Sequence, residues 1–156
     1  MKARQTGFTL VELIVIIAIL GILAAVAIPR YVNNTQQARI GVLNGVTASI
    51  RGAVQQTQGL YQIAYASNTA VTTVTLRDGT TVTVTTRTAT DPGGLPVVAA
   101  GGIDNAVTLP SGMAYDGATG RFYFTSVGNV AGCGAVYATP RTAANPFTVT
   151  ITSTAC

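Results

Sequence analysis

The strongest constraint in this sequence is an unbroken apolar run from Phe8 to Ile28, in which Glu12 is the only charged residue. As a helix the run is about 31 Å long, enough to cross the hydrocarbon core of a bilayer. Lys2 and Arg4 precede the run, and such charges hold the start of an apolar segment on the cytoplasmic side. A carboxylate within the run costs about 3 kcal/mol on insertion, so Glu12 calls for a functional explanation.

The start of the chain resembles class III signal peptide proteins, that is, type IV pilins and their pseudopilin relatives. The resemblance rests on a basic leader followed by Gly7, Phe8, Glu12, Gly21 and Pro29. It implies that a prepilin peptidase cuts between Gly7 and Phe8 and that the new Phe8 amine is methylated. An ordinary secretory signal would carry its small-residue cleavage site after the apolar run, not before it. The remaining alternative is a single-pass anchor in which Glu12 is incidental.

The pattern after the apolar run predicts that the helix continues beyond the membrane. Apolar residues recur at intervals of three and four at Leu43, Val46, Ile50 and Ala53/Val54, which is typical of an amphipathic helix. We expect one helix from about Phe8 to Leu60, with a kink or local break at Pro29, because proline lacks the amide donor and crowds the preceding turn.

Period-two alternation replaces the helical pattern from about Ala70 onward. Valines and a leucine flank Asp78-Gly79, the dipeptide that favours a tight type I′ hairpin. Further strands are predicted over 107–115, 121–127 and 146–154, with a turn at 117–120. Phe122 and Phe124 share one face of the 121–127 strand, which indicates a core face. A long helix packed on an antiparallel sheet is an α+β fold.

The resemblance implies the same ladle-shaped fold and a division of the chain into four parts. These are a cleaved leader (1–7), a transmembrane and filament-core helix (8–28), an amphipathic helix (29–60) and a globular head (61–156). In family filaments the helix unwinds between the positions that match Gly21 and Pro29. The resemblance also places a disulfide-bounded loop near the C-terminus.

The two cysteines, Cys133 and Cys156, both follow the apolar run and therefore lie on its exported side. An even count in an oxidising compartment favours one disulfide over two free thiols. Closing a loop of this size stabilises a fold by about 3 kcal/mol in the chain-entropy model.

Composition argues against catalysis and against nucleic-acid binding. The chain has no His, its only Lys is in the leader, and only 9% of its residues are charged. No enzyme activity, cofactor or metal is expected. Asp78, Asp91, Asp104 and Asp116 occupy turn-like contexts, although a Ca²⁺ shared by Asp104 and Asp116 is a weaker alternative. Without the leader, seven Arg against five acids leave a net charge of +2, too small to indicate nucleic acid.

We therefore expect a structural subunit (major pilin) of a type IV pilus that serves adhesion, motility or DNA uptake. Its partners would be copies of itself in a helical homopolymer, the prepilin peptidase and methyltransferase, the inner-membrane assembly platform, and the membrane before assembly. The precursor would lie in the bacterial inner membrane and the mature subunit in a surface pilus. The Phe8 amine of an incoming subunit would pair with Glu12 of a neighbour and so set the register.

Two alternatives stay open at this point. One is a type II secretion pseudopilin or a minor pilin, although major pseudopilins typically bind Ca²⁺ through a C-terminal acidic loop and lack the terminal disulfide. The other is a membrane-anchored binding module that never polymerises. Such a module would need a clustered basic or aromatic patch, and we expect Arg77 and Arg87, which flank the predicted hairpin, to have no aromatic neighbours. The stretch from Arg30 to Gly59 also resembles pilins of the mannose-sensitive haemagglutinin type.

Overall fold

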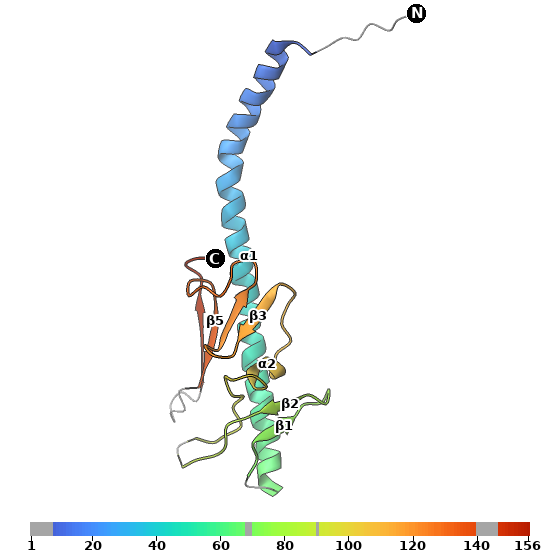
Figure 1. The fold of residues 1–156 in the computed structure, drawn as a ribbon, viewed down its shortest axis with the longest axis vertical. Coiled ribbons are helices and arrows are strands. Elements are labelled where there is room, and N and C mark those ends of the chain that lie inside the picture. The colour runs from blue at the N-terminus through green and yellow to red at the C-terminus, as the bar shows by residue number, and fades with distance from the viewer. Residues whose placement is uncertain (1–7, 68–69, 90, 140–146) are drawn as a thin grey trace, which may run out of the picture. The chain divides into compact units, whose positions relative to one another are not determined.

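The computed structural model describes residues 8–67, 70–89, 91–139 and 147–156 (Figure 1). The chain divides into two compact units, Met1–Ala38 and Arg39–Cys156. One helix, α1 (Leu10–Ser67), begins in the first unit and ends in the second. In the described residues, the second unit also holds the short helix α2 (Ile103–Ala106) and six strands.

Helix α1 confirms the predicted long helix but differs from the prediction in two respects. It ends at Ser67, not near Leu60, because its buried stripe extends two turns beyond Val54, to Tyr61, whose ring stacks on Tyr65 at 5.6 Å between centroids. The helix also runs through Pro29 without interruption, so the expected break is absent there. Proline removes only one amide donor, and the turns on both sides retain theirs.

The amphipathic half of α1 carries the core of the second unit. Its stripe of residues at three- and four-residue spacing is buried as predicted: Leu43, Val46, Ile50, Ala53 and Val54. These side chains pack against Phe122, Ala135 and Tyr137 of the larger sheet. A second cluster centres on Tyr61 and takes in the valines of the β1–β2 hairpin. The helix therefore provides one continuous apolar wall for both sheets.

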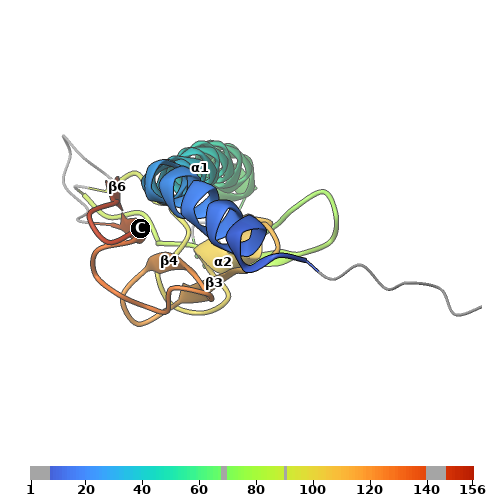
Figure 2. The same ribbon diagram turned by 90° about the horizontal axis from the view of Figure 1, so that it is seen from above.

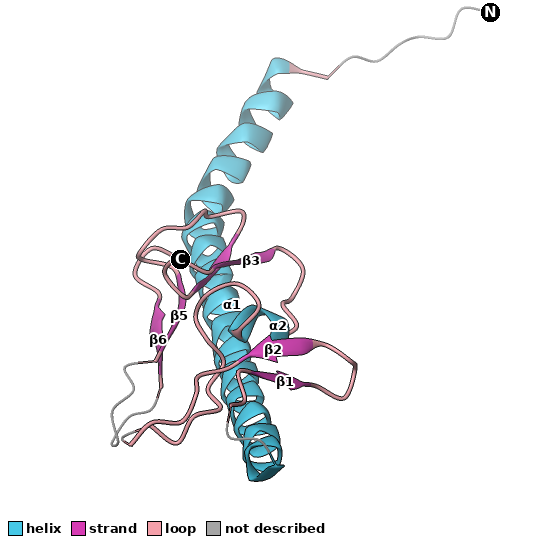
Figure 3. Ribbon diagram, turned by 60° about the horizontal axis from the view of Figure 1, so that its bottom comes forward, coloured by secondary structure: helices cyan, strands magenta, loops and turns pink. Residues whose placement is uncertain are grey.

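The larger sheet has four antiparallel strands in the order β3-β4-β5-β6. Figure 3 labels β3, β5 and β6 of this sheet. The bounds of the four strands are β3 (Met113–Asp116), β4 (Arg121–Phe124), β5 (Gly134–Ala138) and β6 (Thr148–Thr152). The predicted turn at 117–120 joins β3 to β4, where Asp116 pairs with Arg121. The prediction for 146–154 is confirmed over β6, while Pro146 lies outside the described residues.

Two parts of the larger sheet depart from the prediction. The strand expected over 107–115 begins only at Met113, because Pro110 has no amide donor and Gly112 adopts a φ of +84°. Strand β5 was not predicted. It begins with Gly134 and Ala135, residue types that are depleted in strands, and both are buried at the centre of the sheet.

The smaller sheet is the hairpin of β1 (Thr73–Thr75) and β2 (Thr81–Thr83). The hairpin is confirmed, but its predicted two-residue type I′ turn is wrong. Leu76 and Thr80 close a three-residue loop in which Gly79 has a φ of +89°. This loop sets Val74 opposite Val82, so both face the core. A two-residue loop would shift the pairing by one residue and turn one valine to solvent.

Candidate functional site: the N-terminal end of the long helix

Phe8 and Thr9 precede the first helical residue of α1, and Thr9 and Glu12 bond to each other there. The Thr9 amide donates to Glu12 Oε2 at 3.0 Å, and the Thr9 hydroxyl donates to the same oxygen at 2.8 Å. In return, the Glu12 amide donates to Thr9 Oγ1 at 3.3 Å. This reciprocal pair is a capping box, and it satisfies amide donors that have no partner within the helix.

The capping box gives Glu12 a role that the sequence analysis missed. The signal was present, since Thr9-Leu10-Val11-Glu12 fits the pattern of Ser or Thr followed three residues later by Glu. The carboxylate also lies at the positive end of the helix dipole, which stabilises a negative charge. Glu12 thus has a partner in its own chain, and its pairing with a neighbour's Phe8 amine stays a prediction.

The first unit exposes apolar side chains on every side of α1. Phe8 is 83% exposed, and the other large apolar side chains of the run are exposed as well: Leu10, Val11, Leu13, Ile14, Val15, Ile16, Ile17, Ile19, Leu20, Ile22, Leu23, Val26 and Ile28. By length and composition, α1 could cross a membrane. A helix that is apolar all round needs lipid or other apolar helices around it.

Three other residues of this segment were predicted to be functional: Gly7, Gly21 and Pro29. Gly7 lies outside the described residues. Gly21 has no atom within 4 Å of the position that a Cβ would take, so space for a partner is open there. Pro29 lies within the continuous helix. Unwinding between Gly21 and Pro29 stays a prediction.

The predicted disulfide joins Cys133 to Cys156, so the alternative of two free thiols is wrong. Cys133 is fully buried, and it immediately precedes β5. Arg39 holds the end of the same segment, because its guanidinium donates to the Cys156 carbonyl. The guanidinium carbon of Arg39 also lies 6.0 Å from the centre of the Phe124 ring. The disulfide and these contacts fasten the C-terminal segment to the second unit.

The four aspartates hold loops together. Asp78 accepts from the Thr80 amide at 2.9 Å, Asp91 from the Gly93 amide at 2.8 Å, and Asp104 from the Gly101 amide at 3.2 Å. Asp116 accepts from the Ala118 amide, the Thr119 hydroxyl and the Asn129 side chain. Among the described residues no group of three or more acids, cysteines or histidines is placed to hold a metal ion.

Local bonds and burial also set the pKa values of the groups around these loops. Hydrogen bonds, first from the Thr119 side chain, lower the pKa of Asp116 below its ordinary value. Burial raises the pKa of Tyr115, and the charges of Asp104 and Asp116 add to that effect. Burial likewise raises the pKa of Tyr137. Both hydroxyls donate to backbone carbonyls, Tyr115 to Val98 and Tyr137 to Pro96.

One expectation about the arginines is wrong. Arg87 has an aromatic neighbour after all, because its guanidinium carbon lies 5.4 Å from the centre of the Tyr65 ring. The Arg87 amide also donates to the Tyr61 hydroxyl at 2.8 Å. The sequence could not reveal this contact, since Tyr65 and Arg87 meet only through the fold. A single stacked pair ties the loop after β2 to the end of α1.

Comparisons with known proteins each match a part of the chain. The prokaryotic N-terminal methylation motif matches residues 2–28. Type IV major fimbrial protein FimA of Dichelobacter nodosus is 44% identical over 55 residues, which are 35% of this chain and 35% of FimA. Type IV narrow pilus major component PilA5 of Thermus thermophilus is 46% identical over 50 residues, 32% of this chain and 43% of PilA5.

A third relative belongs to a secretion system. Type II secretion system core protein G of Pseudomonas aeruginosa is 40% identical over 53 residues, 34% of this chain and 37% of that protein. No solved structure matches the chain. The chain spans about a third of the length of the curated fimbrial relatives that it matches first. Residues 2–28 of this chain thus match the prokaryotic N-terminal methylation motif, and type IV fimbrial proteins are among the relatives of the chain.

Proposed function

We propose that this chain is the structural subunit of a type IV pilus and that it acts by polymerising, without catalysis. The observation that carries the proposal is the methylation motif at the N-terminal end of α1, where the large apolar side chains of the run are exposed on all sides. The second unit has its own core and its own disulfide, so it does not need the apolar run to fold. The run is therefore free to lie in the inner membrane first and among other subunits afterwards.

The proposed assembly follows from the chemistry at the N-terminal end of α1. Cleavage between Gly7 and Phe8 by a prepilin peptidase creates a cationic Phe8 amine, which is then methylated. A charge at that depth loses most of its water, so an unpaired one is costly and a paired one fixes the register between subunits. Glu12 supplies the opposite charge. The assembly platform of the inner membrane would transfer the subunit from lipid to the growing filament.

The experiment is electron microscopy of surface material sheared from the cells that express the chain, with mass spectrometry of the filament subunit. We expect filaments whose subunit begins at an N-methylated Phe8. Replacing Gly7 with a bulky residue should leave uncut precursor in the membrane, because the peptidase accommodates only a small residue before the cut. A surface subunit that begins at any other residue would contradict the proposal.

The second candidate is a pseudopilin, favoured by the match to type II secretion system core protein G. A pseudopilin would be cut and methylated in the same way, so processing does not distinguish the two. The distinguishing result is the location of the polymer. Filaments recovered outside the cell at native expression support the pilus, and protein that stays in the cell envelope supports the pseudopilin.

A further inference from the structure

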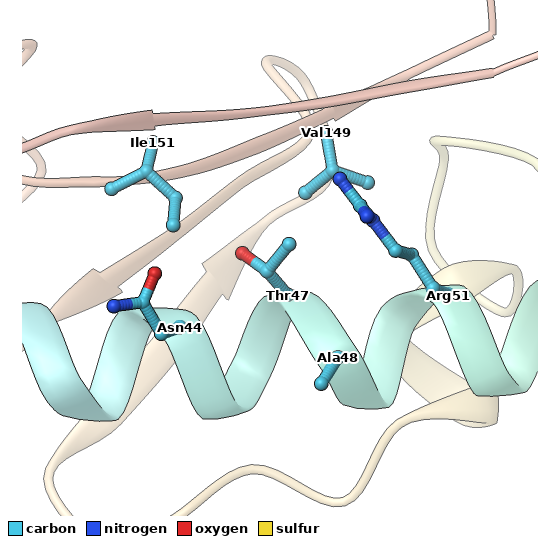
Figure 4. A pocket seen from close by; sticks show the side chains of 6 residues that line it. All are labelled: Asn44, Thr47, Ala48, Arg51, Val149 and Ile151. Carbon is cyan, nitrogen blue, oxygen red and sulfur yellow. The ribbon is translucent and has the colours of Figure 1, made fainter.

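A groove of about 420 Å³ lies between α1 and β6, the edge strand of the larger sheet (Figure 4). It belongs entirely to the second unit. Its walls are Asn44, Thr47, Ala48 and Arg51 from the helix, and Val149 and Ile151 from the strand. A volume of this size suits a ligand or a few residues of a protein partner.

The helical wall of the groove carries polar groups without partners. Thr47 Oγ1 is buried and makes no hydrogen bond. The side chains of Asn44 and Arg51 make no hydrogen bond or ion pair with any residue that the structure describes. All three side chains point toward β6 from one face of α1 (Figure 4). Thr47 Oγ1 is the buried donor among them, and a buried donor is costly when unpaired. Asn44 and Arg51 are exposed to solvent, so an occupant that brings acceptors and a negative charge would complement this wall.

The second unit has four aspartates, and one of them is a suitable negative group. Asp91 is buried, and Asp104 is half-buried beside Tyr115. Asp116 already accepts three hydrogen bonds. Asp78 is exposed at the tip of the β1–β2 hairpin (residues 77–79), where its hydrogen bond to the Thr80 amide orients the carboxylate. The tip is also narrow, because Gly79 has no side chain. No other atom lies within 4 Å of the position that a Cβ on Gly79 would take.

The groove and the hairpin tip lie on opposite sides of the second unit. β6 flanks α1 on one side and the hairpin projects on the other, in views from the side and from above (Figure 1 and Figure 2). Two complementary patches on opposite sides of one subunit give a head-to-tail contact. Such a contact propagates into an open helical polymer unless its rotation closes a ring.

We propose that the hairpin tip of one copy docks in the α1–β6 groove of the next, with the Asp78 carboxylate on the Arg51 guanidinium. Thr47 and Asn44 then donate to carbonyls of the tip, while Val149 and Ile151 cover Gly79. Arg77 has the same charge as Arg51, so the tip enters with Asp78 leading and Arg77 at the rim. This inference rests on the proposed function, because only a polymer repeats the contact.

A charge exchange in the full chain, expressed as the sole subunit, tests the pairing. Arg51→Asp and Asp78→Arg should each lower the yield of surface filaments by at least about tenfold, since like charges then face each other. The chain with both changes should recover most of the yield. Gln56→Asp is the control, because it also introduces a carboxylate on an exposed part of α1, outside the groove.

A second measurement places the contact without relying on yield. A chain with both Arg51→Cys and Asp78→Cys should give a ladder of multimers when its filaments are mildly oxidised. Mixed filaments of two chains, each with one of these changes, should stop at dimers. The native cysteines do not interfere, because they are already bonded to each other.

Failure of the inference can be told from failure of the proposed function. Unchanged yield in both single variants, or normal filaments without a ladder, overturns the docking contact and leaves the pilus proposal intact. Absence of filaments from the natural chain contradicts the pilus proposal itself. Recovery in the double variant together with a ladder supports both.

Discussion

Two glycines of the second unit share a left-handed backbone but differ in their surroundings. Gly79, at the hairpin tip, has a φ of +89°, and Gly120, before β4, has a φ of +69°. A Cβ on Gly79 would meet nothing within 4 Å, whereas one on Gly120 would lie 2.2 Å from the Tyr137 carbonyl oxygen. The Gly120 amide donates to Asp116 and its carbonyl accepts from Tyr137. Gly120 is therefore needed for both conformation and space, and Gly79 for conformation alone.

Alanine at these two positions should separate the two requirements. Gly79→Ala should lower the free energy of unfolding by about 1 kcal/mol, the cost of a left-handed residue with a side chain. Gly120→Ala should lower it by about 3 kcal/mol or more, because overpacking against β5 adds to that strain. Denaturant titration of the full chain in detergent, followed by circular dichroism, measures both. Equal losses would contradict the crowding at Gly120.

At the scale of elements, the sequence predicted those helices and strands whose core-facing positions are filled by large apolar residues. The stripe from Leu43 to Val54 and the core position of Phe122 could be predicted, because large apolar residues at regular spacing have few places to go except the core. Strand β5 could not, since Gly134 and Ala135 are buried only by what packs over them. The loop length of the β1–β2 hairpin was decided by the valine pairing across the strands, not by the dipeptide at the turn.

The Cys133–Cys156 disulfide should stabilise the C-terminal segment that includes β5 and β6. It closes a loop with a sequence separation of 23, so Cys133→Ser should lower the free energy of unfolding by about 2–4 kcal/mol. The subunit should then be degraded and surface filaments reduced. Denaturant titration measures the loss, and alkylation before reduction should find no free thiol in the natural chain. Alkylation of both cysteines in the native, unreduced protein would contradict the bond.

The β3–β4 turn should make stability depend on pH through Asp116. Its folded-state pKa lies below the ordinary value of 3.8, chiefly because of the Thr119 hydroxyl. The stabilisation is therefore complete above that value and is lost as the pH falls through the lowered pKa. Asp116→Asn should reduce stability at neutral pH and flatten the decline between about pH 4 and pH 2. Denaturant midpoints of the natural chain and of Asp116→Asn across this range measure how stability depends on pH. An unchanged slope in Asp116→Asn would show that other groups cause the decline.

At the scale of the whole molecule, Glu12 at the N-terminal end of α1 combines two roles that its own removal cannot separate. Glu12 completes the capping box with Thr9 in its own chain, and in the proposed filament it meets the amine of a neighbour. The first role concerns the start of one helix and is worth about 1 kcal/mol. The second decides whether subunits join at all. The sequence pointed to the second role through the resemblance, while the first required the geometry of Thr9.

A pair of variants distinguishes these roles. Glu12→Val removes both, and Thr9→Val removes the side-chain half of the capping box while it keeps the carboxylate. If pairing between subunits decides assembly, Glu12→Val should insert and be cleaved yet form no filaments as the sole subunit, whereas Thr9→Val should assemble. The filament count of Glu12→Gln should fall between those of the other two variants, because Glu12→Gln keeps the hydrogen bonding and loses the charge. Filament counts by electron microscopy, with immunoblots for processed subunit, provide the measurement. Normal filaments from Glu12→Val would refute the register mechanism, and equal defects in Thr9→Val and Glu12→Val would assign Glu12 to the cap alone.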